Sequence, residues 1–457
     1  MLRRLLPLAL LAAHTAAAQS PVVGDWTGEI VGAGLAVAFH VTEADGALST
    51  TFDVPAQGAL GVPTGATTFR ADTLTVTIPA IGGEYRGVLA DGAITGTWSQ
   101  GGASLPLVLT RGEAAAPPER ADTPRPPFPY RDESVTVTSV DGVVLAGTLT
   151  VPDGAGPFPG VVLVSGSGPQ NRDGEVLGHR LFHVFADHLA RRGVAVLRYD
   201  DRGVAGSTGD HEAATTADLS RDAQAVAEYL AGRPEVSAAG VVGHSEGGII
   251  APIAANASER VDFVVLLAGP AVSGRDVVRY QHGRVLEGAD VSGAARRIYA
   301  DALERTLDAV LTGDPADAAD RGAAAYREAT AGLDAADRAA LRIDEVPAGQ
   351  FAARLATPWL RHFVAYDPAP ALRSLRVPAL AVFAGLDRQV RADDNVPAAR
   401  AALAGAPDGS DVVVFDGLNH LFQPTETGEP VEYGRINTSY DPAVMDLVAD
   451  WVLGRTE

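Results

Sequence analysis

The sequence predicts two domains: a small all-β domain, followed by an α/β domain with a mostly parallel, eight-stranded sheet. The chain has 457 residues, which at roughly 100–200 residues per domain corresponds to two or three domains. Residues 21–112 show short alternating strands separated by turn residues, without a helical period. From residue 131 onward, apolar β runs alternate with Ala-rich helical stretches. That alternation is typical of a parallel sheet covered by helices.

Composition indicates a packed globular protein and excludes several function classes. Hydrophobic residues make up 46% and charged residues 20% of the chain. The net charge is -21, and all 36 basic residues are Arg. Such an acidic chain repels phosphate backbones and anionic membranes, so we expect no nucleic-acid partner and no membrane insertion. Cys is absent, which excludes disulfides, a thiolate nucleophile and a Cys-ligated metal.

The N-terminus has the pattern of a secretory signal peptide. Arg3 and Arg4 give a positive start, residues 5–13 form an apolar stretch, and residues 16–18 are all Ala. The apolar stretch is shorter than the ~20 residues that span a bilayer. We therefore expect cleavage of residues 1–18 before Gln19, and a secreted or periplasmic protein. Without Cys there is no lipobox.

In residues 21–112 several alternating runs predict strands: 35–41, 73–78, 85–89, 93–98 and 105–109. Asp45-Gly46 and Asp91-Gly92 are hairpin signals. The domain is therefore a small barrel or a sandwich. Trp26 near its start and Arg111 near its end resemble the lipocalin-like signature, in which an Arg covers a Trp of the first strand. A buried Trp with an unrelated surface Arg fits the same residues.

Residues 113–130 contain six Pro and predict an extended, semi-rigid linker. After the linker, eight runs predict the sheet of the α/β domain: 134–139, 143–151, 160–164, 194–199, 240–242, 263–267, 379–384 and 412–415. The first two should form an antiparallel hairpin around Asp141-Gly142. Residues 271–372 have helical periodicity and no convincing strand, which predicts a helical insertion that serves as a lid.

A nucleophile motif follows the fifth predicted strand. Gly243-His244-Ser245-Glu246-Gly247 lies between that strand and an apolar helical stretch, the context of a G-x-S-x-G nucleophile turn. Ser245 should have a positive φ, and Gly243 and Gly247 should avoid Cβ clashes there. The backbone N–H of Glu246 would then point at the developing oxyanion. The alternative is a Gly-rich β–α turn.

A serine nucleophile needs a base and an orienting carboxylate. Of the ten histidines, His420 directly follows the last predicted strand, at the sheet edge where doubly wound folds place their ligands. Asp387 follows the seventh strand at the same edge, and Asp393 and Asp394 are alternatives. The order Ser245, Asp387, His420 is the one that α/β-hydrolases use.

The other histidines fit this role less well. His40 is isolated in the β domain, and the side chain of His244 should point away from Ser245. His179, His183 and His188 are expected on one helix, where His179 and His183 could mimic a metal-binding face; no HExxH motif and no carboxylate spacing supports a metal there.

The second oxyanion donor should come from the small-residue loop after the third strand. We select Ser167, with Gly166 and Gly168 as alternatives, and a flexible Gly/Ser loop as the competing interpretation. Residues 199–203 follow the fourth strand. They should line or buttress the site, or form a capped turn.

Residues 131–457 resemble the α/β-hydrolase superfamily, and in particular the EstD-type bacterial esterases, whose hydrolase domain is similar to serine aminopeptidases. Five segments carry the resemblance: LVSGSGPQNRDG, RYDDRGVAGSTG, GHSEGG, PWLRHFVAYDPAPALRSLRVPALAVFAGLDRQV and LNHLFQPTETGEPVEY. It implies an α/β-hydrolase fold, a triad of Ser245, Asp387 and His420, short-chain acyl esters as substrates, and no metal or cofactor. Ser165 departs from the pattern, because many hydrolases have His there.

Three functions compete at this stage. The first is a serine carboxylesterase acting on a small-molecule ester. The second is a peptidase with the same triad, in which Glu246, taken as an exposed acid, would bind an amine. The third is a secreted, non-enzymatic binding protein. In the insertion, Phe351, Trp359 and Phe363 should shape an acyl pocket. The sequence leaves the oligomeric state open.

Overall fold

The computed structural model describes residues 20–455, apart from 32–34, 45, 56–58, 101–102, 113–119, 288 and 345. The expected signal peptide, 1–18, lies outside the described residues, as does Asp45 of the first hairpin signal. The chain divides into two compact units, residues 1–117 and 118–457.

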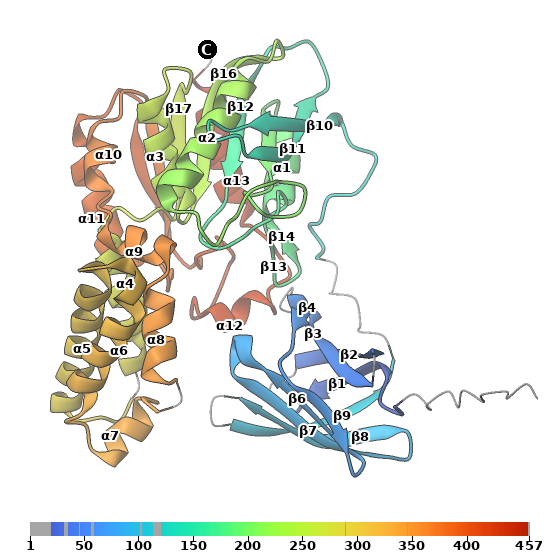
Figure 1. Cartoon of the computed structure of the whole chain (residues 1–457). Helices are drawn as coiled ribbons and strands as arrows, with labels where there is room; N and C mark the ends of the chain where they lie inside the picture. Colours follow the sequence, from blue (N-terminus) through green and yellow to red (C-terminus); the bar gives the residue numbers. More distant parts are fainter. Residues whose placement is uncertain are drawn as a thin grey trace, which may run out of the picture. The chain divides into compact units, whose positions relative to one another are not determined.

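The first unit is an antiparallel half-barrel (Figure 1). Its described strands follow the order β4-β3-β2-β1-β9-β8-β7-β6-β5. Their bounds are β1 Gly24–Ile30, β2 Leu35–Ala44, β3 Ala47–Val54, β4 Ala59–Pro63, β5 Thr67–Arg70, β6 Thr73–Ile78, β7 Gly83–Ala90, β8 Ala93–Gln100 and β9 Ala103–Arg111, with a short 3-10 turn, η2, at Pro79–Ile81. Residues alternate between buried and more exposed along β6 and β7. That alternation is what places one face of each strand in the core.

Aromatic side chains fill the half-barrel. Phe39 contacts Phe52 and Tyr85, with ring centroids 4.9 and 5.3 Å apart, and Trp98 stacks on Phe52 at 5.2 Å. Trp26 is also buried, and the Arg111 guanidinium lies over its ring, 4.4 Å from the centroid. Arg111 also donates to the Val23 carbonyl at 2.8 Å. The predicted pairing of Trp26 with Arg111 is therefore confirmed.

The second unit is built on a mixed, mostly parallel sheet (Figure 1). Its order is β10-β11-β15-β12-β16-β17-β18-β19, and β10 and β11 are antiparallel to their neighbours. The strands are β10 Tyr130–Thr138, β11 Val144–Pro152, β12 Phe158–Val164, β15 Ala195–Tyr199, β16 Val236–His244, β17 Phe263–Leu267, β18 Ala379–Ala384 and β19 Asp411–Phe415. All eight predicted runs form strands, and the hairpin at Asp141-Gly142 is present.

Helices cover both faces of this sheet. One core contains side chains of α2 (Thr216–Ala231), α3 (Gly247–Ala257) and α11 (Ala392–Ala402). The other contains side chains of α1 (Leu181–Arg191) and α13 (Pro442–Leu453). The inner strands are buried on both faces, which explains their continuous apolar sequences.

Two smaller features complete this unit. A short hairpin pairs β13 (Glu175–Val176) with β14 (His179–Arg180), and α12 (Pro430–Tyr433) precedes α13. His179 therefore lies on β14, so its prediction as part of a helix with His183 and His188 was wrong. The reason is Gly178, whose φ of 80° forms the hairpin turn and delays the helix to Leu181.

The residues between β17 and β18 are helical, as predicted. The helices are α4 Gly274–Gly283, α5 Gly293–Leu311, α6 Ala318–Thr330, α7 Ala335–Ala340, α8 Ala348–Leu355, α9 Pro358–Ala365 and α10 Ala369–Arg373, with 3-10 turns η3 Arg284–Leu286 and η4 Pro315–Asp317; a further turn, η5 Leu403–Gly405, follows α11. Over the described residues, no helix is long and apolar enough to cross a membrane.

Candidate active site

Ser245 lies at the tip of the turn that joins β16 to α3, with a φ of 54°. A left-handed backbone at a residue with a side chain is strained, and the surrounding structure must enforce it. The glycines allow this. A Cβ on Gly243 would lie 1.9 Å from the Gly247 carbonyl oxygen, and one on Gly247 would lie 2.4 Å from that of Val164. The sequence motif therefore forms the sharp turn that a nucleophile requires.

His420 and Asp387 are in direct contact. Nδ1 of His420 lies 2.7 Å from Oδ2 of Asp387, and both side chains are buried. The other carboxylate oxygen of Asp387 accepts the backbone N–H groups of Gln389 and Val390 at 2.7 and 2.8 Å. Asp394 instead pairs with Arg391 in the first turn of α11. The structure thus brings Asp387, rather than the alternative carboxylates, to the histidine.

His244 contacts the loop that carries His420. Its Nε2 lies 2.9 Å from the His420 carbonyl oxygen, and the two rings are 4.9 Å apart. Burial and the neighbouring His420 lower the pKa of His244 to about 4, so the ring is neutral at pH 7 and its N–H donates to that carbonyl. The ring is thus directed to the His420 backbone, and His244 is one of the residues that line the cavity with Ser245.

The loop after β12 lies beside Ser245. A Cβ on Gly166 would lie 3.0 Å from the Ser245 Cβ, and Gly166 and Ser167 line the same cavity as the serine. The Ser165 hydroxyl donates to Asp201 at 2.7 Å, and the Gln170 N–H donates to the other oxygen of that carboxylate at 2.9 Å. Ser165, the departure from the family pattern, thus anchors the loop to residues after β15.

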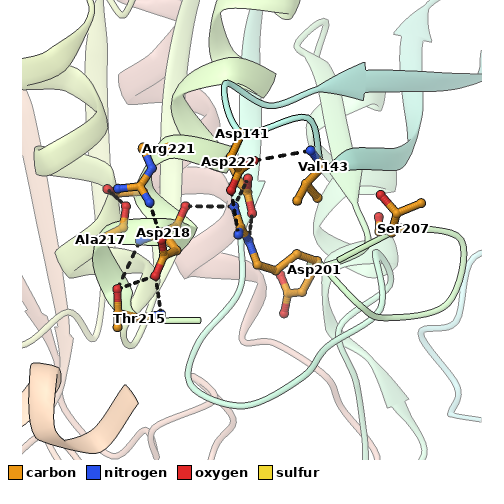
Figure 2. A network of polar contacts seen from close by, with 12 residues as sticks. Asp141, Val143, Asp201, Ser207, Thr215, Ala217, Asp218, Arg221 and Asp222 are labelled. Atoms are coloured by element: carbon orange, nitrogen blue, oxygen red, sulfur yellow. Dashed lines mark hydrogen bonds and ion pairs between the residues drawn. The ribbon is translucent and has the colours of Figure 1, made fainter. Parts of the chain in front are cut away.

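The segment after β15 buttresses this loop. Asp201 holds it directly, and next to it the Arg202 guanidinium binds Asp222 at 2.6 and 2.7 Å and Asp141 at 3.0 Å. Figure 2 labels these carboxylates together with Thr215 and Asp218, whose capping box begins α2. Of the two functions predicted for residues 199–203, the buttress fits the structure.

Glu246 is buried, so its description as an exposed acid was wrong. It is 1% exposed. Its carboxylate accepts the Thr216 hydroxyl at 2.7 Å and the indole N–H of Trp359 at 2.9 Å. Trp359 lies on α9, so this contact joins the helical insertion to the turn that carries Ser245. No sequence pattern links residues so far apart, and sequence reasoning missed the contact.

A cavity of about 350 Å³ contains Ser245 and His420. Two helices of the insertion contribute apolar side chains to its lining: Val277 and Val278 of α4, and Trp359, Leu360 and Phe363 of α9. Trp359 and Phe363 stack with their centroids 5.6 Å apart. Phe351 is not a lining residue. It packs inside the insertion on Tyr326, 4.5 Å between centroids.

The remaining histidines lie in other surroundings. His40 bridges Asp25 and Asp53 at 2.7 and 2.9 Å, so it is not isolated as expected. His179 is fully buried among polar groups of the α/β unit. Among the described residues, no group of three or more His, Cys, Asp and Glu has the arrangement of a metal site.

Comparison with known proteins places the chain in a family. Residues 178–423 match the model of the hydrolase family described as serine aminopeptidase S33. The chain belongs to this family. It is an α/β-hydrolase, and the matched residues include Ser245, Asp387 and His420.

Relatives and solved structures are similar to this hydrolase. Esterase EstD of Thermotoga maritima is 28% identical over 328 residues, which cover 72% of this chain and 68% of that protein. An esterase of Pyrococcus furiosus is 14% identical with a TM-score of 0.44, covering 74% of this chain and 96% of that one. An α/β-hydrolase from Penicillium sp. sh18 is 18% identical with the same TM-score, covering 71% and 99%.

Proposed function

We propose that this hydrolase is a serine carboxylesterase that cleaves short-chain acyl esters. One observation carries the proposal: Ser245, in its left-handed turn, shares a cavity with His420, and a buried Asp387 holds His420 Nδ1 at 2.7 Å. This is the arrangement of a nucleophile with its base and an orienting carboxylate. The esterase relative, EstD, supports the choice of substrate class.

In the proposed reaction, Nε2 of His420 takes the proton from the Ser245 hydroxyl as Oγ attacks the ester carbonyl. The backbone N–H groups of Glu246 and Ser167 bind the developing oxyanion. The tetrahedral intermediate breaks its bond to the alcohol, which leaves with the proton from His420. Water, activated by the same histidine, then attacks the acyl-enzyme and releases the acid.

The cavity lining favours uncharged substrates. It includes two acids, and both already have partners: Glu246 binds Thr216 and Trp359, and Glu175 binds Asn171 and Arg180. Among the lining residues that the structure describes there is no Arg, so a substrate carboxylate meets no guanidinium there. The carboxylates of Glu246 and Glu175 already accept hydrogen bonds from protein groups, for which a substrate ammonium would have to compete.

An aminopeptidase is the second candidate, favoured by the description of the family model. Such an enzyme needs a free acid for the substrate amine, and the partners of Glu246 and Glu175 argue against one. Hydrolysis of a p-nitrophenyl ester series beside an aminoacyl-p-nitroanilide series separates the candidates. We expect turnover of the acetate and butyrate esters; faster turnover of the anilides would favour the peptidase.

The catalytic assignment is tested by Ser245→Ala, His420→Ala and Asp387→Asn. We expect kcat to fall about 10⁴-fold or more for the first two and by orders of magnitude for the third, because the three groups act as a unit. An aryl fluorophosphonate should label native Ser245 and fail with Ser245→Ala. Asp394→Asn is the matched control and should retain activity. Full esterase activity in Ser245→Ala would contradict the proposal.

We further propose that the enzyme is exported, on the basis of the signal-peptide pattern in residues 1–18. Expression of the full chain in a bacterial host, followed by N-terminal sequencing of the protein outside the cytoplasm, should give a sequence beginning at Gln19. An intact Met1 on a protein confined to the cytoplasm would contradict this.

A further inference from the structure

Residues 120–122 lie near the start of the second unit and are joined to the rest of it by partly buried polar contacts. Asp122 accepts the backbone N–H and the hydroxyl of Ser439, the hydroxyl at 3.0 Å. Ser439 is fully buried, and its Oγ lies 3.1 Å from Nδ1 of His179. Asp122 thus reaches, through one hydroxyl, a histidine that the proposed reaction does not use.

From His179 the contacts continue to the loop that carries His420. Nε2 of His179 lies 3.0 Å from the Tyr433 carbonyl oxygen and 3.1 Å from Nε2 of Gln423. Oε1 of Gln423 accepts from Nδ2 of Asn419 at 3.0 Å.

The last residue in this chain of contacts is Asn419, which lies in the loop that carries His420. Its Oδ1 accepts the backbone N–H groups of Leu421 and Gln423 at 2.9 and 3.0 Å. It therefore ties the residue before His420 to the backbone of the residues that follow His420.

The same segment also holds the rim of the cavity. The buried Arg120 guanidinium donates to the carbonyl oxygens of Leu177 and Gly434, at 2.6 and 2.9 Å. Leu177 follows β13, and Gly434 follows α12 (Figure 1). Their neighbours Val176 and Tyr433 line the cavity. One short segment thus contacts two parts of the cavity wall and, through His179, the histidine loop.

We propose that Asp122 and His179 are positioning residues that hold the His420 loop through the chain Asp122–Ser439–His179–Gln423–Asn419. The proposal rests on the proposed function, in which His420 is the base. Ser439, His179, Gln423 and Asn419 are all 0% exposed. The chain is continuous when the His179 proton is on Nδ1: Nδ1–H donates to Ser439 Oγ, whose hydroxyl donates to Asp122, and Nε2 accepts from the Gln423 amide. A buried network of this kind is rigid, and removal of one member leaves buried polar groups without partners. Loss of Asp122 should therefore loosen the whole chain of contacts.

The consequence for His420 follows from how it is held. Asp387 fixes its ring, whereas His244 and Asn419 fix its backbone. If the backbone shifts, the ring still pairs with Asp387 but presents Nε2 to Ser245 in a less favourable geometry. A displacement of about 1 Å at a catalytic group can cost up to about 100-fold in rate. The step affected is proton transfer, so kcat should change and substrate binding should not.

The test compares Asp122→Ala, Asp122→Asn and a control in the full chain, with p-nitrophenyl acetate as substrate. We expect Asp122→Ala to lower kcat about tenfold and to leave KM within about twofold. Asn keeps one acceptor for Ser439, so Asp122→Asn should recover kcat to within about threefold of native. The control is Asp446→Ala, which removes a half-exposed carboxylate that binds His188 and Arg192. It should leave kcat unchanged.

A second measurement reports on the geometry of His420 and Ser245 without depending on binding of the ester. The rate of Ser245 phosphonylation by a fluorophosphonate should fall in Asp122→Ala by the same factor as kcat. His179→Gln should also lower kcat, and the double variant should be little worse than either single variant, because the two residues act through one chain.

Two results overturn the inference: native kcat and phosphonylation rate in folded Asp122→Ala, or fully additive effects of Asp122→Ala and His179→Gln. If Asp122→Ala does not fold, native kcat in both Asp122→Asn and His179→Gln overturns it as well. Failure of the proposed function is distinguishable, because Ser245→Ala would then hydrolyse the ester at the native rate whatever the Asp122 variants do.

Discussion

Asp201 is a buried carboxyl group whose ionisation opposes folding. Burial, together with the nearby carboxylates of Glu246 and Asp222, raises the pKa of Asp201 to about 7, although the Ser165 hydroxyl and the Gln170 N–H stabilise its charged form. In the unfolded chain the same group ionises near 3.8. The folded state therefore holds a proton that the unfolded state releases. The contribution of Asp201 to the free energy of unfolding is therefore complete below pH 3.8, where the group is protonated in both states. It is lost as the pH rises through about 7, the pKa in the folded state.

Asp201→Asn should therefore stabilise the protein at pH 8. The amide can donate to Ser165 Oγ and accept from the Gln170 N–H, so both contacts of the loop survive without the buried charge. We expect Asp201→Asn to have a higher melting temperature than the native protein at pH 8. At pH 5 the two melting temperatures should differ less. The neighbouring Asp200→Asn is the control. Burial opposes ionisation of Asp200, but hydrogen bonds from Arg172 and Gly206 lower its pKa, so Asp200→Asn should destabilise at pH 8. A lower melting temperature for Asp201→Asn at pH 8 would contradict the argument.

Residues of the site were predictable where their role is local. Ser245 is identified by the glycines around it, and Asp387 and His420 by the strand ends that precede them. The burial of Glu246 was not predictable, because its partner Trp359 belongs to a different element and lies 113 residues away. A short motif determines the local backbone turn. The contacts that its side chains make with distant elements depend on the whole fold.

At the scale of elements, helix α9 forms part of the cavity wall. Trp359 is held by Glu246 at 2.9 Å and stacks on Phe363. We propose that α4 and α9 act as a lid that limits acyl length, with Trp359 fixed in place by its contact with the nucleophile turn.

Trp359→Ala should widen the cavity and favour longer esters. We expect the ratio of kcat/KM for p-nitrophenyl octanoate over acetate to rise about tenfold, the effect of a few methylenes gaining an apolar contact. Phe351→Ala is the matched control, because Phe351 belongs to the same insertion but packs on Tyr326. It should leave the ratio unchanged. An unchanged ratio in Trp359→Ala would show that α9 is only a structural cover.

In the first unit, His40 links three strands. It lies on β2 and binds Asp25 of β1 and Asp53 of β3. Hydrogen bonds from the protonated ring to Asp25 and Asp53 raise the pKa of His40 above 6.5. The contribution of His40 to stability is therefore complete below pH 6.5 and is lost as the pH rises through the raised value.

His40→Gln should weaken β1–β3 at low pH and have less effect at high pH. Protection of the amides of these strands against hydrogen exchange, measured in the full chain at pH 6 and pH 9, tests this. The loss of amide protection in His40→Gln relative to the native protein should be large at pH 6 and small at pH 9. An equal loss of protection at both pH values would show that the ring stabilises the strands by packing rather than by charge.

The strands of the α/β sheet were predictable because the inner ones are continuous apolar runs and the first one alternates between apolar and polar residues, each bounded by turn residues. The hairpin β13–β14 was not, since each of its strands has only two residues. Runs of two residues are too short to show an alternating pattern. Polar contacts hold it instead, and these connect segments far apart in the chain, such as Leu177 with Arg120.

At the scale of the whole molecule, the position of the boundary between the two units determines at which residue an isolated hydrolase must begin. The sequence predicts an extended linker over residues 113–130, which would place the start of an independent hydrolase near Pro129. The contacts divide the chain at Pro117–Pro118 instead. Arg120 and Asp122 lie after this division and bind Leu177, Gly434 and Ser439 of the hydrolase.

Two truncated chains test the importance of this segment. A chain beginning at Pro118 keeps Arg120 and Asp122, and we expect it to hydrolyse p-nitrophenyl acetate with a kcat within about twofold of the full chain. A chain beginning at Pro129 lacks both, so the Ser439–His179 contacts and the cavity rim lose their partners; we expect kcat to fall about tenfold or more. Melting curves would show whether each chain is folded. Equal activity of the two folded chains would mean that residues 118–128 serve only as a linker, and low activity of both would mean that the half-barrel itself contributes to the hydrolase.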